Sequence, residues 1–194
     1  MNSVYLKEDE LEKPISRSDR RYQHITKILK KRTGDLVAAC CSDGSIGTAH
    51  IDELSESDIR LHYQPRSWAP QLRPLRLLLG FPRPIKAGRI LKDLTTLGVC
   101  EIWFVLTDTS EKSYAESDFF SNKDFESHLI EGAEQAGNPR LPGIRTFWSL
   151  DRALEELGET AEPGEYNTAA STRGQNEATR IVLHVDTSLP ALME

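Results

Sequence analysis

The apolar pattern of this chain changes on either side of a proline-rich segment, and that change limits the folds available to it. Residues 64–74 hold three prolines in eleven positions. Before them, short runs over 36–41, 46–51 and 59–63 predict strands, and the last two alternate apolar and polar side chains as half-buried strands do. After them the apolar runs are continuous, which is typical of strands buried on both faces of a parallel sheet. These later runs cover residues 75–81, 101–106 and 181–185.

Helices are predicted between the later runs, over 87–97, 122–136 and 150–157. Gly98 is expected to end the first, and Ser121 with Asp124 resembles a capping box at the start of the second. The order strand, helix, strand, helix, helix, strand implies a parallel sheet with helices packed on it.

We therefore predict an α/β chain with a small β-domain over residues 1–66, a linker over 67–74 and an α/β domain over 75–194. Residues 158–179 contain no Ile, Leu, Val or Phe, so we expect a mobile surface insertion there.

Residues 17–32, called the basic segment below, carry seven Lys or Arg side chains against one Asp. A helix is predicted over 16–32, with Ser18 as its cap and an apolar face formed by Tyr22, Ile25, Ile28 and Leu29. The basic side chains then lie mostly on the other face. Such a stripe can bind a phosphate backbone although the chain has a net charge of −6. The alternative interpretation is a solvated helix face.

A polar cluster stands at the end of the second predicted helix, where loops commonly build sites. Glu131, Glu134 and Gln135 precede a helix stop at Gly137, and Arg140 follows it. Glu131 and Gln135 are one turn apart and share a face, while the planar fork of Arg140 suits a phosphate or a carboxylate. Glu131, Gln135 and Arg140 are the candidate catalytic residues. A structural polar network at a subunit interface is the alternative.

Several other functions lose support from the sequence. It contains no GxGxxG motif for dinucleotide binding, no GxxxxGK[ST] P-loop and no GxSxG nucleophile elbow. Its five histidines form no HxxxH or HExxH pair, so we expect no metal site. Cys40, Cys41 and Cys100 have no metal-binding spacing and are interpreted as small buried side chains, with a reactive thiol as the alternative. We expect no membrane span and no signal peptide, and hence a cytoplasmic protein.

Four stretches in order resemble the RsmE family, the S-adenosylmethionine-dependent enzymes of the SPOUT superfamily that methylate N3 of a uridine in 16S ribosomal RNA of the small ribosomal subunit. Residues 21–30 with Gly34 and Asp35 are similar to the motif HLxxVLR…GD. Residues 75–81 with Lys86 are similar to the strand and lysine that open the catalytic domain. Residues 92–99 are similar to KxxELGV, and residues 131–142 to EAxEQxxRxRxP. Thr96 and Asn138 depart from the family's usual Glu and Arg.

The resemblance implies a PUA-like β-barrel followed by a SPOUT-type trefoil-knot methyltransferase domain that acts as a homodimer, with RNA held across both subunits. It implies that side chains of the basic segment contact RNA, as do two lysines beside the first helix of the catalytic domain. His24 is expected either to touch RNA or to pack the helix on the barrel. The strand end at Leu183 and His184 is expected to border the S-adenosylmethionine pocket. The implied RNA-binding residues are Arg20, Arg21, His24, Lys27, Lys30, Lys31, Lys86 and Lys92.

The family continues into a GPEGG loop and an RxLRxETA segment that form the knot around the methyl donor, and this sequence contains neither. We therefore expect most of the S-adenosylmethionine site to lie beyond Glu194. The alternative is a non-catalytic RNA-binding homologue that has lost the donor site. The implied reaction moves a methyl group from a sulfonium to a ring nitrogen that must first lose its proton, so positioning of donor and base supplies most of the rate.

Overall fold

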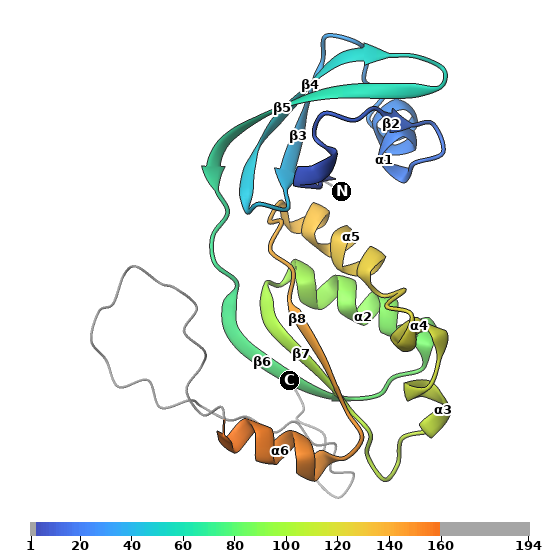
Figure 1. The fold of residues 1–194 in the computed structure, drawn as a ribbon, viewed down its shortest axis with the longest axis vertical. Coiled ribbons are helices and arrows are strands. Elements are labelled where there is room, and N and C mark those ends of the chain that lie inside the picture. The colour runs from blue at the N-terminus through green and yellow to red at the C-terminus, as the bar shows by residue number, and fades with distance from the viewer. Residues whose placement is uncertain (1–2, 160–194) are drawn as a thin grey trace, which may run out of the picture. The chain divides into compact units, whose positions relative to one another are not determined.

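The computed structural model describes residues 3–159, which form a mixed α/β fold with a curled sheet and a parallel sheet (Figure 1). Residues up to Ala153 belong to one compact unit. No helix among residues 3–159 has the length and apolar composition needed to cross a membrane. The predicted strand over 181–185 and all but the first two residues of the predicted insertion over 158–179 lie outside the described residues.

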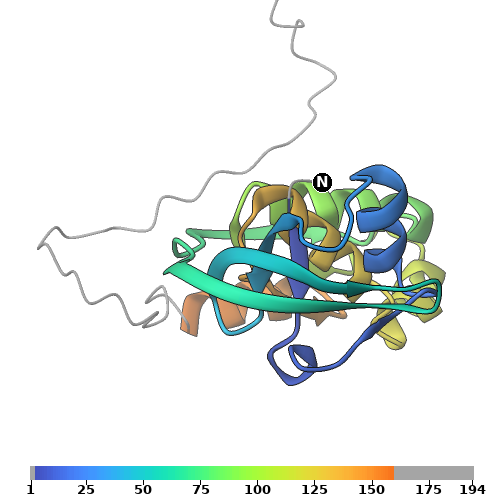
Figure 2. The same cartoon turned by 90° about the horizontal axis from the view of Figure 1, so that it is seen from above.

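The N-terminal sheet has five strands in the order β1-β3-β4-β5-β2. β1 runs parallel to β3, and the other pairs are antiparallel. The strands predicted from the alternating pattern are confirmed, although β4 and β5 are longer than predicted and form the bent hairpin seen in Figures 1 and 2. Barrel closure stays a prediction. The strands are β1 (Val4–Leu6), β2 (Ile15–Ser16), β3 (Leu36–Cys41), β4 (Ser45–Leu54) and β5 (Asp58–Trp68).

The basic segment is less helical than predicted. The α-helix α1 covers only Arg20–Gln23 and continues into a π-helical turn, η2 (His24–Ile28). Asp19, not Ser18, caps it by accepting a hydrogen bond from the Arg21 N–H. In the wider turn the Leu29 N–H donates to the His24 carbonyl, an i→i+5 bond that shifts the helix faces. The predicted apolar face is therefore wrong at Ile28, which is 69% exposed.

The second sheet is parallel in the order β6-β7-β8. The first two strands, β6 (Arg73–Gly80) and β7 (Val99–Val105), lie where strands were predicted. Five of the seven residues of β7 are buried, whereas every residue of β6 is exposed or half-buried, so the predicted burial on both faces is wrong for β6. The third described strand, β8 (Gly143–Phe147), was not predicted, because its sequence holds only two apolar side chains. Since β5 continues to Trp68, the connection between the sheets is residues 69–72, shorter than the segment 67–74.

Helices α2 (Pro84–Thr96) and α5 (Glu126–Ala136) pack against each other beside the parallel sheet. Gly132 makes this approach close, because a Cβ built on it would lie 2.6 Å from the Lys92 carbonyl oxygen. The predicted capping box is wrong, since Phe125 precedes α5 and no side chain caps it. Two short helices, α3 (Lys112–Ala115) and α4 (Asp118–Ser121), occupy the connection before it, and α6 (Leu150–Glu159) follows β8.

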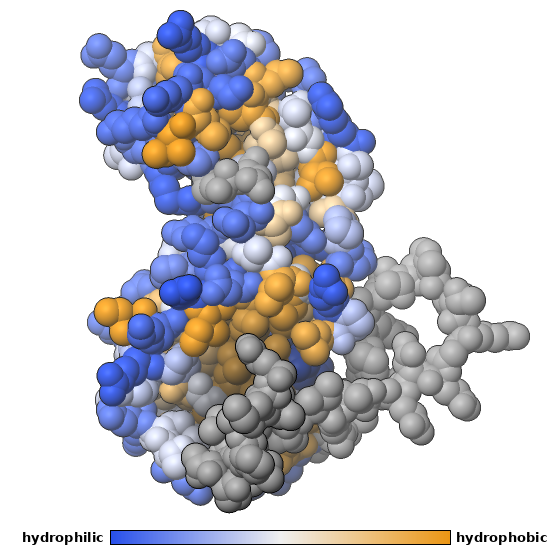
Figure 3. All heavy atoms as spheres, turned by 180° about the vertical axis from the view of Figure 1, so that it is seen from behind, coloured by the Kyte–Doolittle hydropathy of each residue, from blue (hydrophilic) through white to orange (hydrophobic). Residues whose placement is uncertain are grey.

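The two faces of the parallel sheet differ in chemistry. The face toward the helices is apolar and centres on Ile102 and Phe104. On the alternate side chains of β7, Trp103 is fully buried, with the guanidinium of Arg76 at 4.4 Å and that of Arg145 at 5.0 Å from its ring centroid. Figure 3 shows further apolar side chains on the surface of the half of the molecule that contains the parallel sheet. Those that are exposed include Leu75, Ile85, Leu97 and Trp148.

Candidate functional site

The C-terminal half of α5 brings the N-terminal sheet and α2 together. The helix ends at Gly137, as predicted, which adopts the left-handed conformation with φ of 66°. Glu134 lies in its last turn and is fully buried. Glu131 lies one turn earlier and is partly exposed.

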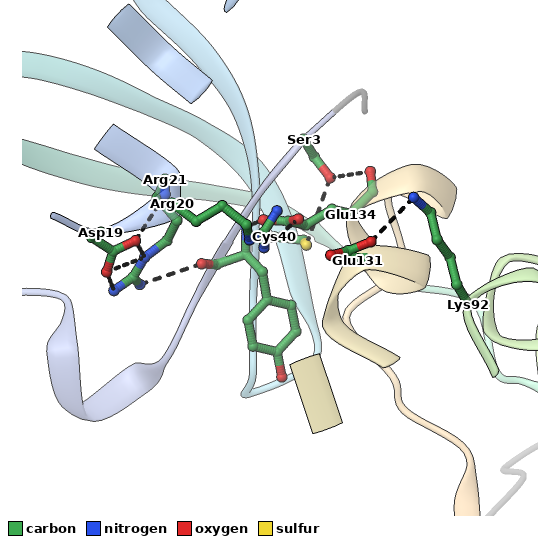
Figure 4. Close-up of polar contacts among 9 residues, drawn as sticks. Ser3, Asp19, Arg20, Arg21, Cys40, Lys92, Glu131 and Glu134 are labelled. Carbon is green, nitrogen blue, oxygen red and sulfur yellow. Dashed lines mark hydrogen bonds and ion pairs between the residues drawn. The ribbon is translucent and has the colours of Figure 1, made fainter. Parts of the chain in front are cut away.

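Three residues from two segments contact Glu134 (Figure 4). Arg20 of α1 places its Nη2 2.7 Å from Glu134 Oε2, and the Tyr5 N–H of β1 donates to Oε1 at 3.2 Å. Ser3 donates from its hydroxyl to the Glu134 carbonyl at 3.0 Å. Burial raises the pKa of Glu134, and Arg20 and the Tyr5 N–H oppose this rise without cancelling it. The arrangement is a buried carboxylate on α5 whose side-chain partners come from β1 and α1.

Glu131 makes the corresponding contact on the other side, toward α2. Its Oε2 accepts a hydrogen bond from Lys92 Nζ at 3.2 Å, and both side chains are about a third exposed. The structure thus brings together Glu131, an expected catalytic residue, and Lys92, an expected RNA-binding residue. Gln135 is exposed, and its side chain makes no hydrogen bond with the described residues, so of the two residues predicted to share a face only Glu131 has a side-chain partner there.

Arg140 lies beside the N-terminal sheet. Its N–H donates to Asn138 Oδ1 at 3.1 Å, and its Nε donates to the Ala69 carbonyl at 3.5 Å. A Cβ built on Gly44 would lie 3.4 Å from Arg140 Nη2, so the guanidinium packs against the β3–β4 turn. Among residues 3–159 it makes no hydrogen bond or ion pair with Glu131.

The basic segment contains one arginine that is held by carboxylates and lysines that are largely exposed. Arg21 is held by Asp19 at 2.8 Å and Glu10 at 2.9 Å, which raises the pKa of Arg21, and Arg21 lowers that of Asp19. Lys27 and Lys30 are exposed, and Lys31 is half-buried. Lys30 adopts a positive φ of 52° where the π-helical turn ends. The exposed lysines are therefore presented by a segment that ion pairs hold in place.

His24 and Lys86 have contrasting surroundings. The His24 ring is half-buried, its Nε2 has no hydrogen-bond partner among residues 3–159, and burial lowers the pKa of the ring. Lys86 is exposed on the first turns of α2. The remaining expected residues, Leu183 and His184, lie outside the described part of the chain.

The carboxyl edge of the parallel sheet carries polar groups that sequence reasoning missed. Ligands of such sheets commonly bind at this edge. Thr107 and Ser110 follow β7, with their hydroxyl oxygens 2.7 Å apart, and Gly80 ends β6 beside them. Within residues 3–159 no three His, Cys, Asp or Glu side chains group as metal ligands would.

Glu134 was also passed over in favour of Glu131 and Gln135. A usable signal existed, because Ile130, Ala133 and Glu134 stand at i, i+3 and i+4, the spacing of one buried face. Ala133 is fully buried, and Ile130 packs against the same cluster. A carboxylate on the apolar face of a helix therefore indicates a buried ion-pair partner more strongly than a carboxylate on the polar face does.

Comparison with known proteins adds sequence and structural relatives. Residues 70–187 match the family model of the RNA methyltransferase domain. "Ribosomal RNA small subunit methyltransferase E" of Treponema pallidum is 32% identical and aligns over 87% of this chain and 73% of its own length. "Ribosomal RNA small subunit methyltransferase E 1" of Borreliella burgdorferi is 34% identical and aligns over 81% of this chain and 66% of its own.

Solved structures resemble the fold at lower sequence identity. A probable rRNA-methyltransferase from Porphyromonas gingivalis has a TM-score of 0.60 at 18% identity, with 78% of this chain and 63% of that one covered. A ribosomal RNA small subunit methyltransferase E from Neisseria gonorrhoeae, bound to S-adenosyl methionine, has a TM-score of 0.54 at 18% identity, with 80% and 65% covered. The chain therefore spans about two thirds of the length of these proteins.

Proposed function

The chain belongs to the RsmE family of ribosomal RNA small subunit methyltransferases, and from this premise we propose that the protein methylates N3 of a uridine in 16S ribosomal RNA with S-adenosylmethionine as donor. The observation that carries the proposal is the family match over residues 70–187 together with a basic segment attached to the same helix as the candidate site. Relatives named for this activity and a neighbour bound to S-adenosyl methionine support it.

Lysines and Arg20 of the basic segment hold the RNA backbone in this proposal. Lys27 and Lys30 are exposed, and Arg20 keeps 45% of its side chain exposed while it pairs with Glu134. Lys86 and Lys92 extend the contact along α2. Contacts of this kind orient RNA without reading its sequence. Arg21, with two carboxylates already bound, contributes mainly by holding the segment in shape, and His24 by packing.

The donor, when bound, supplies an electrophilic methyl group, and the described residues offer a polar edge that fits such a ligand. Gly80 has no side chain beside the hydroxyls of Thr107 and Ser110, where a Cβ would lie 3.6 Å from Ser110 Oγ. We propose that Leu183 and His184 border the same edge. We propose that RNA held on α2 reaches the polar pair of Glu131 and Lys92, with Gln135 one turn later on α5. Arg140 follows the end of α5 and lies beside the N-terminal sheet.

Uracil N3 carries a proton that must leave before the nitrogen attacks. In the proposed reaction Glu131 accepts that proton or orients the water that does, and the Lys92 ammonium stabilises the uridine anion. Arg140 and Gln135 bind the nucleotide beside it. Replacing Glu131 with Gln while Lys92 is kept is expected to lower kcat more than the affinity for RNA.

The direct test is methylation of small-subunit RNA from a strain that lacks the modification. The protein and S-adenosylmethionine should produce N3-methyluridine, detected by mass spectrometry of digested RNA. RNA binding without donor binding or product would instead establish the non-catalytic alternative. Micromolar donor binding to the 194-residue chain, measured by calorimetry, would exclude that alternative.

Other properties of the family belong to the same proposal. The curled N-terminal sheet is proposed to be a PUA-like barrel that extends to the end of β5 at Trp68, joined by residues 69–72 to a SPOUT-type knotted domain that begins with β6 at Arg73. A homodimer that acts in the cytoplasm on ribosomal RNA is proposed, and the exposed apolar side chains of the parallel-sheet half are consistent with a subunit contact.

A further inference from the structure

Glu134 is the one charged residue among residues 3–159 whose side chain is buried, and the proposed reaction does not use it. Burying a carboxylate costs several kcal/mol, and a well-packed apolar side chain at such a site often serves stability equally well. A buried ion pair is therefore weak evidence for a stabilising role. The role of the ion pair between Glu134 and Arg20 is therefore inferred from its geometry.

The geometry joins parts of the chain that are far apart in sequence. Arg20 and Tyr5 belong to the N-terminal sheet and its helix, and Glu134 belongs to α5, which packs on α2. Glu131, three residues before Glu134, pairs with Lys92 of α2. Figure 4 shows Glu134 and Glu131 between Arg20 on one side and Lys92 on the other. The terminal cations are 45% and 39% exposed.

We propose that Glu134 and Arg20 are a positioning pair, which fixes the basic segment on α5 so that its lysines and those of α2 form one RNA-binding surface. When the two groups of lysines are fixed relative to each other, an RNA bound by one group is held close to the other. The second group then binds the same RNA at a high effective concentration. A loosened junction loses that advantage for long RNA and leaves each separate contact unchanged. The inference rests on the proposed RNA substrate.

The test compares Glu134→Gln with Glu126→Gln in the 194-residue chain. Both variants remove one negative charge from α5, and Glu126 is exposed, so it controls for net charge. Each is titrated with a short oligonucleotide of about 5 nucleotides and with a small-subunit RNA fragment of about 20 nucleotides, lengths that fit one and both groups of contacts.

Glu134→Gln should weaken binding of the long RNA by roughly tenfold and lower its salt slope by about 1, while short-RNA affinity changes less than about twofold. Glu126→Gln should leave both affinities equal or slightly higher, because it only reduces repulsion. Equal losses for long and short RNA in Glu134→Gln would overturn the inference, and so would no loss for either.

A second measurement keeps the inference separate from the proposed function. Hydrogen exchange should be faster at the Tyr5 amide in Glu134→Gln, because the neutral amide oxygen of Gln accepts this hydrogen bond more weakly than the carboxylate does, and unchanged at the β7 amides. Spin labels at exposed Thr33 and Arg89 should show a broader distance distribution in the variant. If the unmodified chain binds no RNA, the proposed function fails. If these two readouts do not change, the positioning role fails.

Discussion

Replacing Gly132 with Ala should destabilise the contact between α5 and α2. The added Cβ would lie 2.6 Å from both the Lys92 carbonyl oxygen and Thr95 Cβ, so backbone must move to accept it. Alanine gains about 1 kcal/mol of helix propensity over glycine. Overpacking costs about 1–3 kcal/mol, and a clash with backbone belongs at the upper end. The net expectation is a loss of about 2 kcal/mol in the free energy of unfolding.

Gly88 of α2 provides a matched control. A Cβ there would lie 2.5 Å from His128 Nε2, the far end of a side chain that can rotate away. Gly88→Ala should therefore be neutral or stabilising by up to about 1 kcal/mol. Urea denaturation of both variants measures the difference, and thermal melts should show a decrease of roughly 4–8 °C for Gly132→Ala alone. Equal effects of the two substitutions would refute the close-approach argument.

Three further predictions concern single groups. Burial raises the pKa of Glu134, so the stability due to its protonation is complete below its unfolded pKa of about 4.3 and is lost as pH rises through the folded value. The unfolding free energy of the native protein relative to Glu134→Gln should therefore fall as pH rises through this window, and urea melts that show a rise would contradict the sign. Lys30→Gly should stabilise by about 1 kcal/mol, because the φ of 52° favours glycine, whereas Lys30→Ala should bring no such gain in the same melts. Burial raises the pKa of the Cys40 thiol to about 11, so iodoacetamide should label Cys100 well before Cys40 in the native protein, as peptide mapping would show. Equal labelling rates would disprove this assignment.

The sequence predicted most reliably those elements whose pattern follows from local burial. The runs over 75–81 and 101–106 are apolar on consecutive residues, as is typical of parallel strands, and both fall in strands of the parallel sheet. Burial on both faces follows for most of β7 but not for β6, whose residues are exposed or half-buried. The helix stop at Gly137 was predictable because the left-handed conformation favours glycine. The family resemblance rested on ordered motifs, and the match over residues 70–187 confirms it.

The errors arose where tertiary contacts decide the local structure. β8 pairs with β7, which is mostly buried, and backbone pairing needs few apolar side chains in β8 itself, so its sequence contains no apolar run that would predict a strand. Ile28 and Leu29 fit a 3.6-residue period, but the i→i+5 bond at His24 changes the face they occupy. The ion pair of Glu134 joins residues 114 positions apart, and local spacing carries no information about such a partner.

The position of α5 can be traced to four neighbouring residues that face different neighbours. Successive residues of an α-helix are about 100° apart, so Glu131, Gly132 and Glu134 necessarily point in different directions. Glu131 and Gly132 contact α2, one by an ion pair and the other by backbone approach, whereas Glu134 contacts β1 and α1. Ala133 packs with Tyr5 at the same junction. If α5 were shifted by one residue along its axis, an acidic side chain would occupy the place of Gly132 and a small one the place of Glu134. Close packing on α2 and the buried ion pair with Arg20 would then be lost together.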